Sequence, residues 1–469
     1  MSNDLWRKTA LELASEIRTG KTTSREVLEA HLDRVEKINP HVNAVVRVMA
    51  DDARVAADAA DAAVKRGDTL GPLHGVPLSV KENIDIAGLP TTQGIPLLVE
   101  AVPPADAPII EKMKRAGAIP FVRTNLPDLG LRVHTDSTLY GRTKNPWSQD
   151  RTAGGSSGGE GAALATGMSP IGLGNDIGGS LRNPAHACGI ASIKPTVGAI
   201  ADAQYFPVQD RTLASQAMLT QGVMARRIAD VRAGFLAVIG QHPSDPLSVP
   251  AHFTDIAHGQ RLKVAVLADP PGGSTHPEVA AAVRAAGDVL ANLGHEVVEA
   301  TPPEYEKTLD TWGQMMSAEL RAQLDLLKLA VGENGWKLLE YSMEVIPDVN
   351  LGEYLQAQMA RDGLTRQWQE WFEEHPVLLC PTWTQPPFVY DFDIADRESA
   401  AATLDLMRPV KPANVLGLPA VVVPCGRAEG LPVGVQVMGT RFSDLLCLSV
   451  AEMIEASQPT ITPIDPDGL

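Results

Sequence analysis

One stretch of small residues, 154–196, constrains the fold of this chain more than any other part of it. The stretch reads GGSSGGEGAALATGMSPIGLGNDIGGSLRNPAHACGIASIKPT, and glycines stand next to two of its serines, Ser156 and Ser180. Glycine admits backbone conformations that other residues avoid, and it lets another group approach the main chain closely. The small-residue run between the two serines predicts a helix. Because apolar segments flank the Gly/Ser run closely, we interpret it as part of one large domain, 1–469, and not as a linker.

The composition is that of a globular protein. The chain has 469 residues, 44% of them hydrophobic, which supplies a large core. Its formal charge is −17 and it has no long basic run, so nucleic acid and anionic membrane surfaces are not expected partners. No apolar run reaches the roughly 18 residues of a membrane span, and the N-terminal segment carries acidic residues, unlike a signal peptide.

The cysteines argue against a metal or disulfide framework. Four are scattered along the chain, without CxxC spacing and without paired histidines: Cys188, Cys380, Cys425 and Cys447. We therefore expect buried free thiols in a cytoplasmic protein, no metal and no cofactor, and a monomer or homodimer.

Helix and strand signals alternate along most of the chain. Periodicity predicts helices over 11–18, 24–38, 51–65, 108–116, 277–293 and 444–455, and strands over 42–48, 74–81, 118–123, 262–267, 296–299, 377–380, 420–423 and 433–438. Such alternation is typical of an α/β fold, with a largely parallel or mixed sheet covered by helices.

The segment 305–372 differs from the rest because it is helix-like throughout. It carries four of the seven tryptophans and one apolar stripe at helical spacing. Such a stripe predicts a packed helical layer. The alternative is that part of the segment forms a wall of a substrate pocket.

The sequence around Ser180 favours a role as a nucleophile. The successive N–H groups of 177–180 can form a nest that holds a developing oxyanion, and a hydroxyl beside such donors is what acyl transfer requires. Phosphate-binding loops fail at a required position. A dinucleotide fingerprint starting at Gly172 would need glycine where Ile177 stands, and a P-loop starting at Gly154 would need lysine where Glu160 stands.

A nucleophile elbow, G-x-S-x-G, is a further alternative, because 154–158 matches it. That motif follows a strand, and 149–153 is a poor strand. It also needs an acidic residue and then a histidine downstream. No histidine, His375 included, lies in a sequence context that indicates a catalytic triad. The elbow is therefore the weaker interpretation.

Lys81 ends an apolar strand. A lysine at such a place usually extends its ammonium into water. Here it lies between the motif 75–77, Gly-Val-Pro, and Asn83. A lysine desolvated in a reactive site has a lowered pKa and can serve as a general base.

Together these motifs resemble those of the amidase signature family. They occur in order and with matching spacing, Ser156 preceding Ser180 by 24 positions, and the likeness covers most of the chain. The matching segments are 75–83, 125, 141–146, 154–159, 174–182, 194–196, 380–382 and 418–439. The resemblance implies an α/β/α fold, a layered mixed β-sheet with helices on both faces, whose signature core covers about 71–200.

The resemblance also implies roles for individual residues. Ser180 would be the nucleophile, Ser156, which follows a non-proline cis peptide in this family, would relay protons, and a neutral Lys81 would be the general base. Supporting roles fall to the oxyanion-hole amides and the residues that brace them: Ile177, Gly178, Gly179 and Ser180, with Asp176, Arg182 and Ser157.

The chain departs from the commonest family pattern at three positions. Asn175 and Ile177 replace hydroxyl residues, and Glu160 replaces a small one. The form 158–161 resembles the branch that acts on lipophilic amides. Candidate pocket residues are Gly130, Leu131, Arg132, Trp312 and Met316.

We expect the substrate to be a neutral, lipophilic or aryl amide, either an anilide or, as a further option, a carbamate or ester, with water as the second reactant. Two alternatives remain. One is a glutamine-hydrolysing subunit of a tRNA amidotransferase, which shares the fold and triad. The other is a catalytically silent binding protein, which the intact triad residues disfavour.

Overall fold

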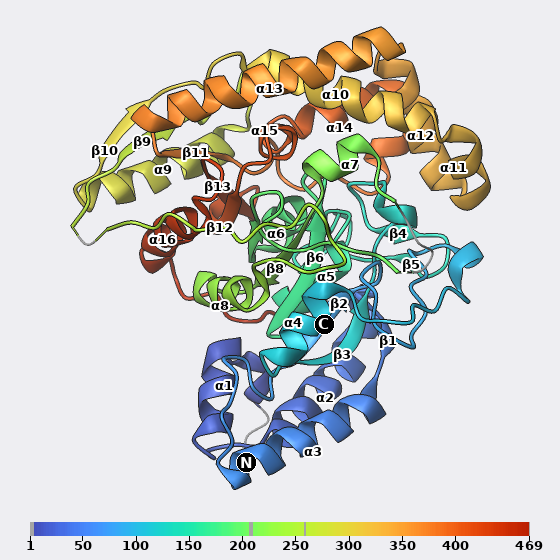
Figure 1. The fold of residues 1–469 in the computed structure, drawn as a ribbon, viewed down its shortest axis with the longest axis vertical. Coiled ribbons are helices and arrows are strands. Elements are labelled where there is room, and N and C mark those ends of the chain that lie inside the picture. The colour runs from blue at the N-terminus through green and yellow to red at the C-terminus, as the bar shows by residue number, and fades with distance from the viewer. Residues whose placement is uncertain (1–3, 206–209, 258, 469) are drawn as a thin grey trace.

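A twisted mixed sheet runs through the centre of the molecule (Figure 1). The computed structural model describes residues 4–205, 210–257 and 259–468. Within these residues the sheet has 11 strands. In spatial order they are β1 (Val45–Val48), β3 (Ile119–Thr124), β2 (Pro77–Lys81), β6 (Ile171–Asp176), β8 (Thr220–Ala225), β7 (Ala191–Lys194), β12 (Ala420–Ala428), β13 (Leu431–Gly439), β11 (Val377–Pro381), β9 (Lys263–Val266) and β10 (Glu296–Glu299). A separate short hairpin pairs β4 (Asp136–Ser137) with β5 (Gly141–Arg142).

Three neighbouring strands bring the sequence motifs to one edge of this sheet. β2 pairs in parallel with β3 on one side and with β6 on the other. Parallel strands end at the same edge of a sheet, so Lys81, Thr124 and Asp176, which end these strands, lie together there. β8 and β7 continue the sheet in antiparallel pairing.

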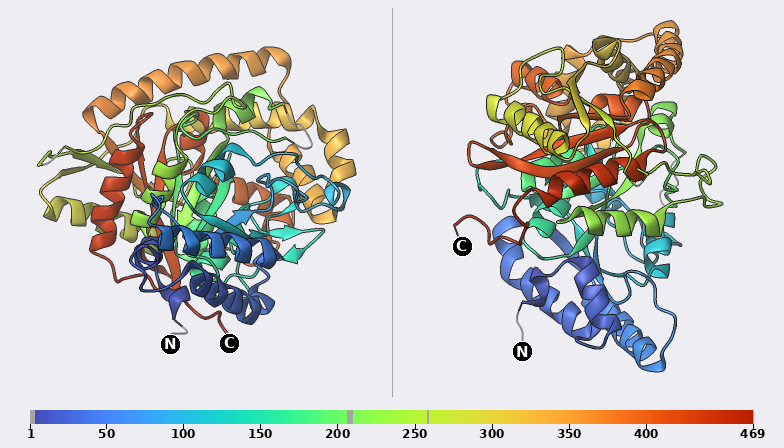
Figure 2. Two further views of the ribbon diagram at one scale, coloured as in Figure 1. Left: turned by 60° about the horizontal axis from the view of Figure 1, so that its bottom comes forward. Right: turned by 90° about the vertical axis from the view of Figure 1, so that its left-hand side faces the viewer.

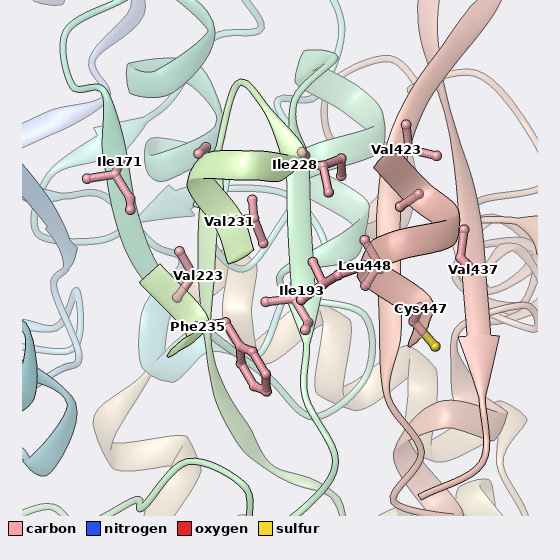
Figure 3. Packing of buried hydrophobic residues seen from close by; sticks show 14 of the residues in the cluster. Ile171, Ile193, Val223, Ile228, Val231, Phe235, Val423, Val437, Cys447 and Leu448 are labelled. Carbon is pink, nitrogen blue, oxygen red and sulfur yellow. The ribbon is translucent and has the colours of Figure 1, made fainter. Parts of the chain in front are cut away.

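One face of the sheet carries the largest apolar cluster. Side chains of β6, β7, β8, β12 and β13 alternate, and those on this face pack against α8 and α16 (Figure 3). Ile171, Val223 and Ile193 belong to this cluster with Phe235 of α8, and so does Val437 with Leu448 of α16, all fully buried. The helices of this face are α1 (Ala10–Arg18), α4 (Pro108–Arg115), α8 (Ile228–Val238), α9 (Pro277–Asn292) and α16 (Asp444–Ala456).

The other face carries the helices that border the serine motifs. α5 (Gly158–Ala165) and α6 (Arg182–Cys188) lie against β2, β6, β12 and β13. A second apolar cluster joins the far half of this face to α10 (Tyr305–Arg321), α13 (Leu351–Glu374), α15 (Lys411–Val415) and α7 (Leu213–Met218). Helices therefore cover both faces of a mixed sheet, and the predicted α/β/α layering is confirmed.

The two ends of the molecule are helical (Figures 1 and 2). At one end α2 (Ser24–Val42) and α3 (Ala50–Arg66) pack beside β3. At the other end lie α10 and α13 with α11 (Leu324–Ala330), α12 (Glu333–Val345) and α14 (Arg397–Leu406). In the described residues, no helix combines the length and the apolar character that crossing a membrane requires.

Most predicted elements are present, with shifts that have local causes. The strand predicted over 42–48 begins at Val45, because α2 continues through Pro40 to Val42 and ends on Asn43 in the left-handed region. The helix predicted between the two serines is correct only for α5. It is followed by β6, a strand that the glycine-rich sequence 171–176 does not reveal. The helix-like segment 305–372 forms α10 to α13, separated by short breaks.

Candidate active site

Lys81 is fully buried at the end of β2, which is itself buried throughout. Its Nζ lies 2.7 Å from Ser156 Oγ and 2.7 Å from Asn175 Oδ1. The Asn175 amide donates in turn to Asn83 Oδ1 at 2.9 Å. The expectation that a strand-end lysine reaches water therefore does not apply here: this amine points into the protein, towards a hydroxyl.

Burial controls the charge of this amine. Loss of hydration disfavours the ammonium form and lowers the pKa of Lys81 to about 7, although the charges of Asp176 and Glu160 partly oppose this. A substantial fraction of the amine is then unprotonated at neutral pH. An uncharged amine next to a hydroxyl can accept a proton from it.

Ser156 is carried by a tightly packed loop between β5 and α5. The peptide bond between Gly155 and Ser156 is cis. A Cβ on Gly155 would lie 2.6 Å from the carbonyl carbon of Val133, so only glycine fits there. Ser156 is 3% exposed. Its neighbour Ser157 donates its backbone N–H to the Ser180 carbonyl oxygen at 3.2 Å, which joins the two serine motifs.

The loop after β6 is organised by the carboxylate of Asp176. That carboxylate accepts backbone N–H donation from Gly179 at 2.8 Å and from Leu181 at 3.0 Å. Arg182 donates to both of its oxygens, at 3.0 and 2.9 Å. Burial alone would raise the pKa of Asp176, but the Arg182 guanidinium and Asn414 hold it well below its usual range. Asp176 is therefore a permanent anion that shapes the turn before Ser180.

The amides of this turn are not equivalent. The N–H of Gly179 is already committed to Asp176 Oδ1. No acceptor is present for the N–H groups of Ile177, Gly178 and Ser180 within the part of the chain that the structure describes. Three of the four predicted oxyanion donors thus remain available, and Gly179 instead holds the turn in shape.

Ser156 and Ser180 open into one cavity of about 560 Å³. Of the pocket residues predicted from the sequence, Gly130, Leu131 and Met316 line it. A Cβ on Gly130 would lie 3.3 Å from Ser156 Oγ, so this loop passes directly beside the hydroxyl.

Arg132 and Trp312 do not line the cavity. The Arg132 guanidinium is buried against Asp393, with N–O distances of 2.9 and 2.7 Å, and also contacts Asp391. Trp312 lies behind the loop after β6, where its indole N–H donates to the Ile177 carbonyl oxygen at 3.3 Å. Both residues therefore support the wall of the site from outside it.

Sequence reasoning missed the polar wall of the cavity. Three of the polar residues that line it are Asp202, Gln221 and Arg211. The Gln221 amide donates a hydrogen bond to Asp202 Oδ1 at 2.7 Å. Arg211 pairs with both Asp202 and Asp245. Asp202 and Arg211 come from the segment between β7 and α7, and Gln221 comes from β8, so no regular spacing in the sequence joins them.

The elbow alternative gains no support from the structure. Ser157 is fully buried and does not line the cavity. Its hydroxyl has no hydrogen-bond partner among the described residues. No histidine belongs to the described cavity lining, and His375 packs on Trp371.

Comparison with known proteins agrees with this geometry. The family model described as Amidase matches residues 26–448. The chain is 39% identical over 456 residues to an indoleacetamide hydrolase of Bradyrhizobium diazoefficiens, covering 96% of this chain and 86% of that protein. It is 34% identical to one subunit of the glutamyl-tRNA(Gln) amidotransferase of Salinispora arenicola, covering 98% of this chain and 99% of that subunit.

A solved structure of 6-aminohexanoate cyclic dimer hydrolase with its substrate superimposes with a TM-score of 0.86, at 28% identity and 99% coverage of both chains. The matched range of the family model contains every strand of the described sheet, and the fold and the motifs agree with it. The chain belongs to the amidase signature family and is a hydrolase that acts on amide carbon–nitrogen bonds.

Proposed function

We propose that the protein hydrolyses a neutral, lipophilic or aryl amide through an acyl-enzyme on Ser180. The observation that carries this proposal is the buried Lys81 amine, 2.7 Å from Ser156 Oγ, in a site that also opens onto Ser180. A desolvated amine beside a hydroxyl is how a lysine acts as a base near neutral pH.

The proposed mechanism gives each part of the site a role. Ser180 Oγ attacks the amide carbon while its proton passes to Ser156, whose own proton passes to the lone pair of Lys81. The oxyanion is held by the N–H groups of Ile177, Gly178 and Ser180. Collapse breaks the C–N bond, and the departing amine takes a proton back through Ser156. Water then attacks the acyl-enzyme by the same route.

The apolar part of the cavity lining supports an apolar acyl or leaving group. This part includes Leu131, Ile177, Leu219, Met316 and Leu320. The likeness to an indoleacetamide hydrolase favours a primary arylacetamide as one substrate. Anilides, aryl carbamates and esters are further candidates, because the same attack on a carbonyl serves all of them.

The test compares variants on a substrate panel. Ser180→Ala should lower kcat/KM for indoleacetamide and for acyl p-nitroanilides by at least about 10³-fold, because no other group forms the acyl-enzyme. Ser157→Ala is the matched control and should keep most activity with an unchanged fold by circular dichroism. Retained activity in Ser180→Ala together with loss in Ser157→Ala would instead favour the elbow.

A glutamine-hydrolysing role in a tRNA amidotransferase is the second candidate, favoured by the 34% identity to such a subunit. Free glutamine carries a carboxylate, and Arg211, a cavity-lining cation, is already paired with Asp202 and Asp245. We therefore expect glutamine to be a poorer substrate than the aryl and alkyl amides of the panel. Glutamine as the best substrate would reverse this ranking.

The four buried free thiols suit the cytoplasm, which we propose as the location of the protein.

A further inference from the structure

A second ionisable side chain is buried behind the catalytic base. Glu160 lies in the first turn of α5, shortly after the Ser156 loop, and is fully buried. It is one of the positions at which the chain departs from the commonest family pattern. Its carboxyl group does not line the cavity, so substrate does not reach it.

Three strands form a receptacle for this carboxyl group. Ser79 of β2 donates to Oε1, and Thr124 of β3 donates to Oε2 at 2.7 Å. On β6, a Cβ at Gly172 would lie 1.7 Å from Oε1, so the space that the carboxyl occupies exists only because residue 172 is glycine. α5 lies against β2 and β6 in the centre of the molecule (Figure 1). This receptacle is therefore shaped to hold the carboxyl group of Glu160.

The receptacle lies on the same side of β2 as the base. Ser79 and Lys81 are two residues apart on one strand, so their side chains share a face. The charged groups that act on Lys81 from the elements around it are Asp176 of β6 and Glu160 of α5, within the described residues. Asp176 is a permanent anion bound to Arg182. Glu160 has no such cation in contact among the residues that the structure describes.

The receptacle suits both charge states of the acid. Burial raises the pKa of Glu160 to about 7, although Ser79, Thr124 and the charge of Lys81 partly oppose this. Ser79 Oγ also lies 3.3 Å from the Ile171 carbonyl oxygen. Its hydroxyl can therefore donate to that carbonyl and accept from a protonated Glu160, or donate to the ionised carboxylate.

We propose that Glu160 is a positioning residue for the base: its carboxylate stabilises the ammonium that Lys81 becomes when it takes the proton from Ser156. This inference rests on the proposed function and extends it to a residue outside the triad. Its physical basis is that a negative charge in a low-dielectric interior acts strongly on a nearby cation. Two groups coupled in this way titrate as a pair.

The experiment measures how fast Ser180 is labelled by an uncharged alkyl fluorophosphonate between pH 5 and 9. Labelling forms the Oγ–P bond and expels fluoride, while the proton goes to Lys81 through Ser156. In Glu160→Gln the ammonium loses its nearby anion. The acid limb of the profile should then move to lower pH by on the order of one unit, and the plateau rate should fall about threefold to tenfold because the base is weaker.

Two further variants make the result specific. Ser79→Ala removes one donor to the carboxylate, which favours protonated Glu160, and should move the limb in the same direction by a smaller amount. Ser169→Ala removes another fully buried hydroxyl, one that bonds the Ile171 carbonyl at 2.8 Å without touching Glu160. Its profile should coincide with that of the unaltered enzyme.

Each outcome has one meaning. If the Glu160→Gln profile superimposes on the parent profile after scaling by a constant, Glu160 has only a packing role and this inference is wrong. If that variant does not fold, an unshifted Ser79→Ala profile leads to the same conclusion. Labelling that persists in Ser180→Ala, or a parent profile without an acid limb, would instead contradict the proposed function.

Discussion

At the scale of single residues, the proposed mechanism depends on an uncharged Lys81 amine. Within the described residues Lys81 has no carboxylate in direct contact; its partners are a hydroxyl and an amide oxygen. Asn175 accepts one N–H of the amine and so orients the rest of it towards Ser156. The amide of Asn175 is itself held by its donation to Asn83 Oδ1.

The pH dependence of turnover follows from this arrangement. Because burial lowers the pKa of Lys81 to about 7 and only the neutral amine accepts a proton, kcat/KM for an uncharged amide should rise with pH through about 7 and then level off. Lys81→Met keeps the apolar chain and removes the base, and should lower the plateau about 10²- to 10⁴-fold. A profile that is flat from pH 5 to 9 would contradict the assignment of Lys81 as the base.

At the scale of elements, α10 connects the helical end of the molecule to the cavity. Met316 and Leu320 are one turn apart on α10 and both line the cavity. Trp312, one turn earlier, instead contacts the loop after β6 from behind. One helix thus supports the loop before Ser180 and forms part of the cavity wall.

This placement predicts how α10 affects substrate length. Each methylene buried on the helix contributes about 0.8 kcal/mol at most, so kcat/KM should rise along p-nitroanilides from acetyl to hexanoyl by up to about tenfold per two carbons. Met316→Ala should flatten that rise several-fold and leave the acetyl compound nearly unchanged. Met359→Ala, an exposed methionine on α13, is the control and should leave the whole series unaltered. An equally steep series in both variants would remove Met316 from the acyl pocket.

At the scale of the whole molecule, sequence reasoning succeeded where the signal is local. Hydrophobic periodicity located α3, α9 and β10, and short motifs located the two serines and Lys81, because each depends on neighbouring residues. It was misleading for Arg132, whose partners Asp391 and Asp393 lie about 260 positions away. The polar wall around Asp202 and Arg211 was missed for a different reason: the two residues are 9 positions apart, between β7 and α7, where no helix or strand pattern indicates which way a side chain faces. Contacts between distant segments are set by how the sheet assembles, which one sequence does not display.

The identity of the nucleophile is tested most directly by trapping the covalent intermediate. The protein would be incubated with an aryl N-alkyl carbamate, quenched in acid and digested, and the modified peptide located by mass spectrometry. Attack forms the Oγ–C bond and expels the aryloxide, leaving a carbamoyl group that hydrolyses slowly. The account predicts one carbamoyl group per chain, on Ser180, and none in Ser180→Ala. A carbamoyl group on Ser157, or turnover of amides without any modification of Ser180, would contradict it.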